Sequence, residues 1–478
     1  MNNYLRSCLL LFLVFLLYCT CLTQCTKPST PVGEALFKVT KNKVYKEINN
    51  DSLKQHLQDY LTKYNKRFKN PNYLRDFYAA NDYQPILLTK FYPDSSLFSL
   101  IDYLEQLEEH GLSKKNYRLK ELKELINRLG DKEIVKSLTA VYDNLVAAEL
   151  LIAESLTNYS FALQYGQVNP RRILNRYYIP VKRPDSLAFK KVLLTTNLRH
   201  HLDSIQPDTR LYKRLQEMLE KSDKTKENKV ALIANMERLR WKYTKDSTKM
   251  VYVNIPAFQL NVIKDKQLIS TMKVVVGKAD GHETPMLSSM IHSVQVNPVW
   301  HIPTSIATKE ILVQAQADRF YLVNHGIDVY YKGEKRENAD SINWLGYNKE
   351  NLPYTFKQKP GNTNSLGLIK FLFKNGSSVY LHDTPVKATF NRSMRAASHG
   401  CVRVEQPLNL ALAIFGEGEK YDTIKEEMGA ADPVARTIKL KPQVQVILDY
   451  FTCTEQAGKL VFYQDVYKQD SVLYSALK

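Results

Sequence analysis

Residues 395–403 read RAASHGCVR, and this stretch places an imidazole, a glycine and a thiol side by side. A second histidine, His382, ends the strand-like segment that precedes it. A thiol attacks an acyl carbon as the thiolate, and an imidazole within hydrogen-bond reach can take its proton and later return one to a leaving amine. The pattern therefore predicts nucleophilic acyl chemistry at Cys401, on a loop that must bring this residue to His382.

The backbone on either side of this pattern favours the same chemistry. Strand alternation places Tyr380 and His382 on one face of a sheet and Leu381 on the other, so His382 can point outward from a strand end. Gly400 permits a close backbone approach, which suits main-chain N–H groups that must face a developing oxyanion. A helix that begins at Pro407 is expected to hold the turn rigid.

Strand signals surround the pattern from about residue 248 onward. Apolar alternation over 250–262, the turn KDK at 264–266 and the apolar run 268–276 predict a hairpin. Further strands are expected at 291–296, 368–373 and 379–382. Together these segments predict a mostly β catalytic domain over residues 248–424.

Two other segments accompany the predicted strands. The polar stretch 301–360, with a helical pattern at 308–316, is longer than an ordinary loop, and such insertions often form lids or binding loops. We therefore expect a capping subdomain at about 301–360, with a surface decoration as the alternative. Residues 425–478 are expected to form a small C-terminal extension of strand and helix.

The N-terminal half of the chain has a helical pattern. Leucines recur at helical spacing at Leu100, Leu104 and Leu107, and residues 134–156 predict one long amphipathic helix. The charges here are dispersed, which is typical of solvated helix faces rather than of nucleic-acid binding. An all-helical scaffold domain is predicted over residues 40–243, and the whole chain is expected to be an α+β protein that does not bind nucleic acid.

Length and composition set outer limits on these predictions. A chain of 478 residues is too long for one ordinary core, so two or three domains are expected. Apolar residues at 44% and charged residues at 24% exclude a disordered, collagenous or multi-span membrane chain. The net charge of +18 favours an anionic partner such as a polyanion, anionic lipid or acidic polymer, without identifying one.

The first segment indicates export. An apolar run over 9–17 follows a short basic start, so residues 1–25 are predicted to be a signal peptide or lipoprotein signal. The segment LTQC at 22–25 resembles a bacterial lipoprotein processing site, although Gln24 stands where a small residue is usual. We expect a periplasmic or cell-envelope protein, with lipid attachment at Cys25, simple cleavage and an N-terminal membrane anchor as the three alternatives.

Cysteine usage points to a chemical role for the thiol in the pattern. The chain has six cysteines, and only Cys401 and Cys453 lie beyond the predicted signal region, which is too few for a disulfide scaffold. A bridge between these two is the structural alternative. Zinc is the other alternative, since His382, His399 and Cys401 could supply three ligands, but no paired CxxC or HxxxH spacing accompanies them and no metal is expected.

With these residues in view, the sequence resembles the L,D-transpeptidase family with a YkuD-type catalytic domain. The hallmark of that family is a histidine followed after a gap by Ser/Thr-His-Gly-Cys, here His382 and residues 398–401. The resemblance extends to the large periplasmic branch with a helical scaffold domain, through residues 156–157, 166–170, 235–241, 253–258, 274–278, 284–285, 297–300 and 359–361.

The resemblance implies acyl transfer on peptidoglycan stem peptides, without a cofactor. Cys401 would attack the carbonyl of the third stem residue, release the terminal D-alanine and form a thioester. A side-chain amine of a second stem would resolve the thioester into a 3-3 cross-link, whereas water would give L,D-carboxypeptidase activity. A non-catalytic wall-binding scaffold is the competing function, and the oligomeric state stays open.

The resemblance also implies roles for single residues. His382 would be the general base, His399 would orient the site, and backbone N–H groups around His399, Gly400 and Cys401 would form the oxyanion hole. The substrate-binding residues would be Tyr380, Trp300, Ser398 and Arg403. Arg403 would bind a substrate carboxylate, with a structural salt bridge as its alternative.

Overall fold

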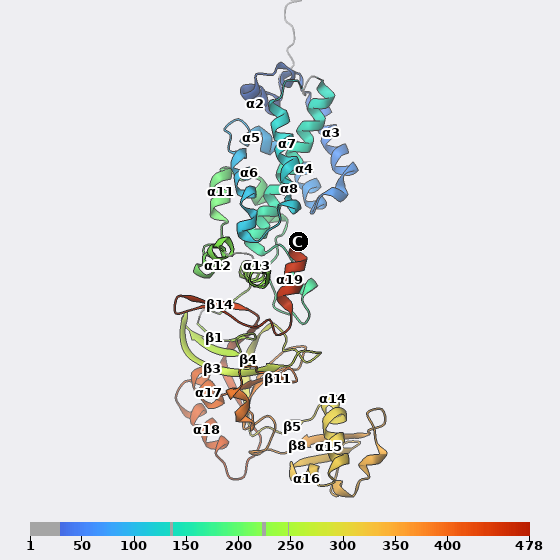
Figure 1. The fold of residues 1–478 in the computed structure, drawn as a ribbon, viewed down its shortest axis with the longest axis vertical. Helices are drawn as coiled ribbons and strands as arrows, with labels where there is room; N and C mark the ends of the chain where they lie inside the picture. Colours follow the sequence, from blue (N-terminus) through green and yellow to red (C-terminus); the bar gives the residue numbers. More distant parts are fainter. Residues whose placement is uncertain (1–28, 134–136, 222–225, 247) are drawn as a thin grey trace, which may run out of the picture. The chain divides into compact units, whose positions relative to one another are not determined.

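The computed structural model describes residues 29–133, 137–221, 226–246 and 248–478 (Figure 1). The predicted signal at 1–25 and the possible lipid site at Cys25 lie outside the described residues. The chain divides into two compact units. Unit 1 comprises Met1–Gln164 with Pro184–Gln206, and unit 2 comprises Tyr165–Arg183 with Pro207–Lys478. Each unit is described by itself below.

Unit 1 is helical in its described part. Side-chain caps begin several of its helices: Thr30 accepts from the Gly33 N–H, and Asn49 accepts from the Ser52 N–H. Its helices are α2 (Pro31–Thr40), α3 (Asn50–Lys63), α4 (Pro71–Ala80), α5 (Ile86–Phe91), α6 (Leu97–Glu105), α7 (Leu119–Gly130), α8 (Leu138–Tyr165), α10 (Ser186–Leu193) and α11 (Leu198–Ser204).

Helix α8 is the central helix of the helical region, and it is buried on all sides over most of its length. The sequence predicted one amphipathic helix over 134–156, but the helix continues to Tyr165, and residues 134–136 lie outside the described part. The prediction of an amphipathic helix was wrong because polar residues of α8 are also buried. Glu149 shows how such a residue is accommodated: its carboxylate accepts from the backbone N–H groups of Leu87 and Leu88 and from the Tyr78 hydroxyl, at 2.7–3.0 Å.

The core of unit 2 is a nine-stranded sheet with the order β11-β3-β12-β10-β9-β4-β13-β1-β2. Strand β2 also pairs with β3, so the sheet closes on itself around an apolar core. The strands are β1 (Lys249–Asn254), β2 (Gln259–Lys264), β3 (Gln267–Gly277), β4 (Leu287–Val296), β9 (Ile369–Phe373), β10 (Leu381–His382), β11 (Ala396–Ser398), β12 (Val402–Val404) and β13 (Arg436–Asp449).

The predicted hairpin is present, but its first strand is divided. Strands β2 and β3 pair across the turn at Asp265 and Lys266, both of which have positive φ. The expectation of one strand over 250–262 was wrong, because the chain turns between β1 and β2 and the two pair with each other. Phe258 adopts φ 51° in this turn, and Pro256, which lacks an N–H, is the residue that could have indicated it.

The C-terminal segment is part of the sheet rather than an appendage to it. Strand β13 lies between β4, to which it is antiparallel, and β1, to which it is parallel. The expected catalytic boundary at residue 424 therefore differs from the structure, because the closed sheet needs a strand from 436–449. After β13 follow β14 (Cys453–Gln456), β15 (Lys459–Phe462) and α19 (Gln469–Leu477).

The expected scaffold boundary at residue 243 also differs from the structure. Helices α12 (Arg210–Lys221) and α13 (Lys226–Arg240) belong to unit 2. Asn235 on α13 bonds to the backbone and hydroxyl of Thr452, and buried Arg238 pairs with buried Asp470 of α19 at 2.5 Å. These contacts join α13 to the C-terminal segment within unit 2.

The insertion predicted at 301–360 forms a subdomain with its own core, built around Trp344 and Phe356 (Figure 1). Its sheet has the order β5 (Trp300–His301), β8 (Tyr354–Gln358), β6 (Ile327–Tyr331), β7 (Glu334–Arg336). Its helical elements are α14 (Thr304–Ile306), the π-helical turn η5 (Ala307–Ile311), α15 (Leu312–Ala317) and α16 (Tyr321–Asn324). We call residues 300–360 the capping subdomain.

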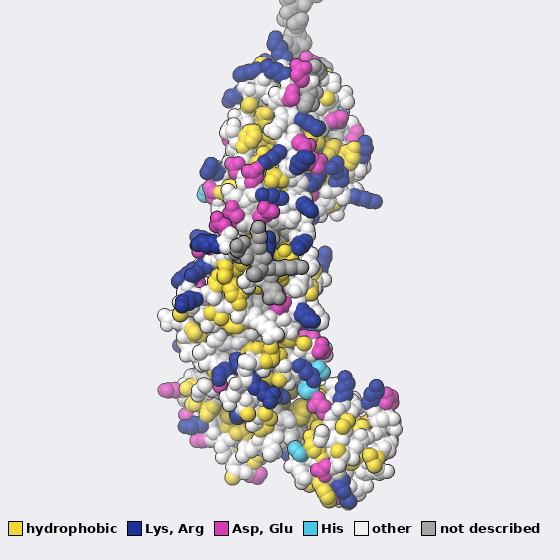
Figure 2. Space-filling model, viewed as in Figure 1, with side chains coloured by type: hydrophobic (Ala, Val, Ile, Leu, Met, Phe, Trp, Pro, Cys, Tyr) yellow, Lys and Arg dark blue, Asp and Glu magenta, His cyan; other side chains and the backbone are white. Residues whose placement is uncertain are grey.

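Positive and negative side chains are interspersed over the visible face of the molecule (Figure 2). This distribution agrees with the prediction of solvated helix faces in the N-terminal half. Among the helices of the described residues, none combines the length and the apolar composition that crossing a bilayer requires.

Candidate active site

Strand pairing brings Cys401 to His382. Strands β10 and β12 are parallel, with Leu381 opposite Val402 and His382 opposite Arg403. The Val402 N–H donates to the Tyr380 carbonyl at 3.1 Å, so the pairing continues to the residue before each strand. Cys401 therefore lies opposite Tyr380, two register positions from His382 and on the same face of the sheet.

The Cys401 thiol is free and half-buried, and Cys453 is free and fully buried. The alternative of a disulfide between them is therefore wrong for this structure. Cys453 packs with Tyr212, Leu215 and their neighbours in a separate apolar cluster, where burial raises the pKa of its thiol to about 12. Its burial leaves Cys401 as the accessible thiol of the described chain.

Burial raises the pKa of the Cys401 thiol above its ordinary value. Hydrogen bonding from Tyr380 and the positive charges of Arg403 and Lys370 lower the pKa, but they do not cancel the effect of burial. The thiol is therefore protonated at neutral pH, and its attack on an acyl carbon requires a base.

The buried His382 imidazole is suited to that task. Burial, followed by the nearby charge of Arg403, lowers the pKa of His382 to about 4, so the ring is neutral at pH 7. Its Nδ1 lies 2.5 Å from the backbone carbonyl of Asp383. Because a carbonyl oxygen only accepts, Nδ1 carries the proton and Nε2 keeps the lone pair that can take another.

Asp383 in turn fixes the loop beside His382. Its carboxylate accepts from the Leu368 N–H at 2.9 Å and pairs with Lys387 at 2.5 Å. Gly367 has φ 62°, and a side chain there would come within 2.4 Å of Asp383. Only glycine therefore fits at residue 367, and sequence reasoning missed this requirement.

Ser398 holds the shape of the motif loop. The Ser398 side chain is buried. Its hydroxyl accepts a hydrogen bond from the Gly400 N–H at 3.1 Å and donates one to the Cys401 carbonyl at 2.6 Å. Ser398 was expected among the substrate-binding residues, but its hydroxyl is fully engaged inside the loop. Its role in this structure is to position Gly400 and Cys401.

The same bonds determine which backbone N–H groups are available to a ligand. The Gly400 N–H is occupied by Ser398, whereas those of His399 and Cys401 have no hydrogen-bond partner among the described residues. Gly400 itself has φ 114°, a conformation that side-chain-bearing residues rarely adopt. The expected oxyanion hole is thus reduced to two candidate donors.

Thr284 and Tyr467, which lie outside the motif, hold its backbone in place through hydrogen bonds. The Thr284 hydroxyl donates to the Gly400 carbonyl and accepts from the Gly277 N–H, each at 2.8 Å. The Tyr467 hydroxyl donates to the Gly277 carbonyl at 2.6 Å and accepts from the Thr284 N–H at 3.1 Å. Sequence reasoning gave neither residue a role, since their contacts depend on pairing between distant segments.

Two cations face the thiol. Arg403 is half-buried, and its Nε is buried without a hydrogen-bond partner in the described part of the chain. Lys370, opposite His382 in the sheet, is half-buried over the Tyr380 ring at 5.5 Å from its centroid. Burial lowers the pKa of both groups, and each acts electrostatically on Cys401. An unsatisfied guanidinium beside a nucleophile is suited to an anionic ligand.

The other three predicted site residues, Tyr380, Trp300 and His399, have different neighbours in the structure. Tyr380 stands against the His382 ring at a centroid distance of 5.6 Å and next to Cys401, so it contacts both reactive groups. Trp300 packs on the core of the capping subdomain. His399 meets Glu310 of the capping subdomain, Nε2 to Oε1, at 2.6 Å.

The zinc alternative has no support from the geometry. His382 and His399 have different neighbours, the Asp383 carbonyl and the Glu310 carboxylate. Within the ranges that the structure describes, no three histidine, cysteine or acidic side chains are grouped as metal ligands would be.

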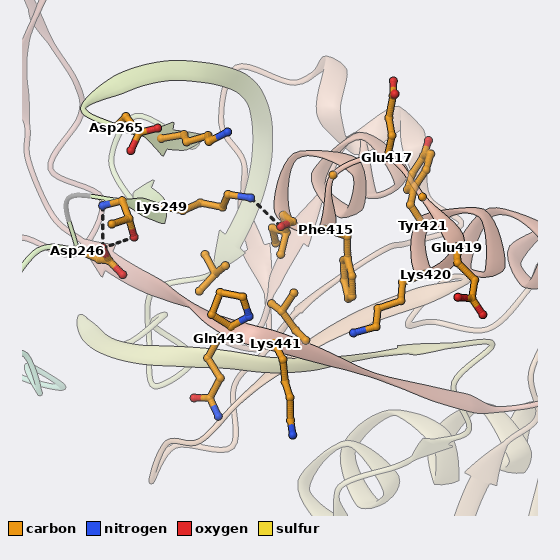
Figure 3. A pocket seen from close by; sticks show the side chains of 18 residues that line it. Asp246, Lys249, Asp265, Phe415, Glu417, Glu419, Lys420, Tyr421, Lys441 and Gln443 are labelled. Atoms are coloured by element: carbon orange, nitrogen blue, oxygen red, sulfur yellow. Dashed lines mark hydrogen bonds between the residues drawn. The ribbon is translucent and has the colours of Figure 1, made fainter.

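A pocket of about 560 Å³ lies elsewhere in unit 2, away from the motif (Figure 3). It is lined by the ends of β1 and β2, by the segment from α17 (Pro407–Phe415) to α18 (Glu419–Met428), and by residues 440–444 of β13. Lys249 points across it to the Ile414 carbonyl at 2.9 Å. Its lysines and carboxylates are equal in number, four of each, so it has no charge preference and lacks a nucleophile.

The fold and motif define a closed β-sheet domain that presents a free thiol beside a neutral imidazole. A model of the L,D-transpeptidase (YkuD) catalytic domain matches residues 248–415, and a scaffold-domain model matches residues 72–219. The chain thus carries the catalytic domain of the L,D-transpeptidase family together with a scaffold domain, as the sequence resemblance predicted.

A relative from Haemophilus influenzae, described as "Putative L,D-transpeptidase", is 31% identical over 239 residues. The match covers 50% of this chain and 48% of the relative, so the chain spans about half of that protein's length.

Proposed function

We propose that this protein is a peptidoglycan L,D-transpeptidase that forms 3-3 cross-links through a thioester on Cys401. The observation that supports the proposal most strongly is the free, half-buried Cys401 thiol, held by β-strand register beside the neutral His382 imidazole. The family match over residues 248–415 agrees with this chemistry.

The first half of the reaction forms the thioester. His382 Nε2 takes the Cys401 proton as Sγ attacks the carbonyl carbon of the third stem residue. The backbone N–H groups of His399 and Cys401 stabilise the oxyanion that develops. The C–N bond to the terminal D-alanine then breaks, and His382 returns the proton to the leaving amine.

The second half transfers the acyl group. A side-chain amine of a second stem attacks the thioester carbonyl, an amide forms, the C–S bond breaks, and Cys401 regains a proton. Water in place of the amine gives a free tripeptide and L,D-carboxypeptidase activity.

Charge complementarity agrees with a stem-peptide donor. Such a donor carries a carboxylate on its terminal D-alanine, close to the bond that breaks. Arg403 and Lys370 place two positive charges beside Cys401, and Arg403 has an N–H without a partner. We assign Arg403 to this donor carboxylate.

The test is an assay of the purified protein on a tetrapeptide-stem muropeptide. Released D-alanine with cross-linked dimer supports transpeptidation, and D-alanine with tripeptide alone assigns the carboxypeptidase. Wall binding with neither product, and no covalent adduct with a carbapenem, assigns the non-catalytic scaffold and overturns the proposal.

We also propose that the protein acts in the cell envelope, because its substrate lies there and residues 1–25 have the pattern of an export signal. Cell fractionation tests this location. Metabolic labelling with a fatty acid, compared between the wild type and Cys25→Ala, tests lipid attachment.

A further inference from the structure

Glu310 of the capping subdomain reaches the catalytic motif. It lies in the π-helical turn η5, and π-helical turns frequently occur at functional sites. Its Oε1 is 2.6 Å from Nε2 of His399, which lies two residues before Cys401. The Glu310 charge also acts on Arg403, the residue that we assign to the donor carboxylate.

This contact stays open to solvent. The Glu310 side chain is 48% exposed and the His399 side chain is 28% exposed. Ion pairs at this level of exposure contribute little to folding stability, and His399 completes this one only when it is protonated. The position of the carboxylate at the rim of the site thus needs an explanation other than stability.

The charges around Glu310 suggest a functional explanation for the position of its carboxylate. Arg403 and Lys370 act on the thiol, and Lys278 and Lys309 act on His282, whose ring stands 4.9 Å from that of His399. These cations suit a donor carboxylate, but they would repel a second substrate that arrives as an ammonium ion. Glu310 contacts the motif at His399, and its carboxylate has the charge that such a substrate requires.

We propose that Glu310 binds the side-chain ammonium group of the acceptor stem peptide and thereby favours its amine over water. This inference rests on the proposed transpeptidase function. The ammonium displaces His399 from the carboxylate, loses one proton to solvent and attacks the thioester carbonyl as the amine. As the amide forms and the C–S bond breaks, the second amine proton passes through His382 to Cys401, so the thiol is regenerated.

The partition of the thioester between amine and water tests this role. The full chain is given an isotope-labelled tetrapeptide-stem donor and increasing concentrations of an unlabelled tripeptide stem that carries a free side-chain amine. Labelled dimer and labelled tripeptide are then quantified. Their ratio depends only on steps after acylation, so it separates acceptor binding from thioester formation.

Glu310→Gln is expected to lower the ratio of dimer to tripeptide about tenfold at subsaturating acceptor, and Glu310→Asp should restore part of it. Glu334→Gln, an exposed acid on β7 of the same subdomain, is the matched control and should keep the wild-type ratio. An unchanged ratio in Glu310→Gln, or a parallel fall of both products, would overturn this inference alone. If the wild type forms neither labelled product, the proposed function itself fails.

Discussion

The Thr284 hydroxyl donates to the Gly400 carbonyl oxygen at 2.8 Å while it accepts from the Gly277 N–H at the same distance. One side chain therefore ties the loop that carries Cys401 to the end of strand β3. Tyr467, from the C-terminal segment, bonds to Gly277 and Thr284 and completes the support. The geometry of Cys401 thus depends on residues far from the motif in sequence.

Thr284→Val should weaken this support without changing the volume of the side chain. The variant leaves the Gly277 N–H and the Gly400 carbonyl unpaired in a buried place, which costs about 1–3 kcal/mol of the free energy of unfolding. Denaturant unfolding should show this loss, and carbapenem acylation followed by mass spectrometry should be slower. Thr355→Val, at an exposed position of β8, is the control; equal behaviour of the two variants would contradict the supporting role.

The pH dependence of acylation should reflect the lowered pKa of His382. A neutral imidazole is required as the base, and its pKa is about 4, so protonation removes activity only as the pH falls through that value. We expect the acylation rate constant to be nearly independent of pH from 7 down to about 5 and to fall below. A decline centred near the ordinary histidine value of about 6.5 would show that His382 is not the base in this environment.

Alkylation of the thiol provides a second pH measurement. Because burial raises the pKa of Cys401 above its ordinary value, iodoacetamide labelling should be slow at pH 7 and should accelerate only at pH values above the ordinary pKa of a cysteine thiol. Peptide mapping identifies the labelled cysteine, with buried Cys453 as the internal control. Rapid labelling of Cys401 at pH 7 would indicate a resting thiolate instead of a thiol.

Arg403 should act mainly on donor binding. Loss of a charge-assisted hydrogen bond of about 1.5–3 kcal/mol corresponds to a roughly ten- to hundredfold lower kcat/KM for the tetrapeptide donor. Arg403→Gln should raise KM for the donor more than it lowers kcat, and Arg403→Lys should retain part of the donor affinity. The control variant Arg392→Gln, at an exposed position, should behave as the wild type. An unchanged kcat/KM together with a loss of stability in Arg403→Gln would assign Arg403 to a structural salt bridge.

Glu149 should be important for the stability of unit 1. Glu149→Ala removes the acceptor for the first N–H groups of α5 and leaves them buried, so we expect a loss of about 3 kcal/mol in the free energy of unfolding. Exposed Glu124→Ala should cost much less. Denaturant unfolding measured by circular dichroism makes the comparison, and equal losses would show that the α5 contacts do not carry the effect.

The sequence predicted the parts of the fold that local patterns encode. Apolar alternation and the KDK turn located the β2–β3 hairpin, and Pro407 marked the start of α17. It did not predict that β13 lies inside the sheet, between β4 and β1, because the residues of a strand do not show which other strands it pairs with. The pairing of β13 with β1 and β4 is a long-range property of the closed sheet.

At the candidate site too, local sequence patterns indicated some residues, whereas roles that depend on long-range contacts were not predicted. Cys401 and His382 were singled out because their side chains carry recognisable chemistry. His382 lies on β10, and Cys401 directly precedes the neighbouring strand β12. Ser398 was assigned to the substrate because a hydroxyl in a motif gives no sign of its direction. Thr284, Gly367 and Lys370 were given no role, although residues 284–285 contributed to the family resemblance, because their roles arise from contacts across distant segments.

The proposed function depends on acylation of Cys401, and intact-protein mass spectrometry after incubation with a carbapenem detects that step. One covalent adduct is expected on the wild type and on Cys453→Ala, and none on Cys401→Ala, whose fold should be unchanged because the lost side chain is small. An adduct on Cys401→Ala, or no adduct on the wild type, would show that Cys401 is not the nucleophile.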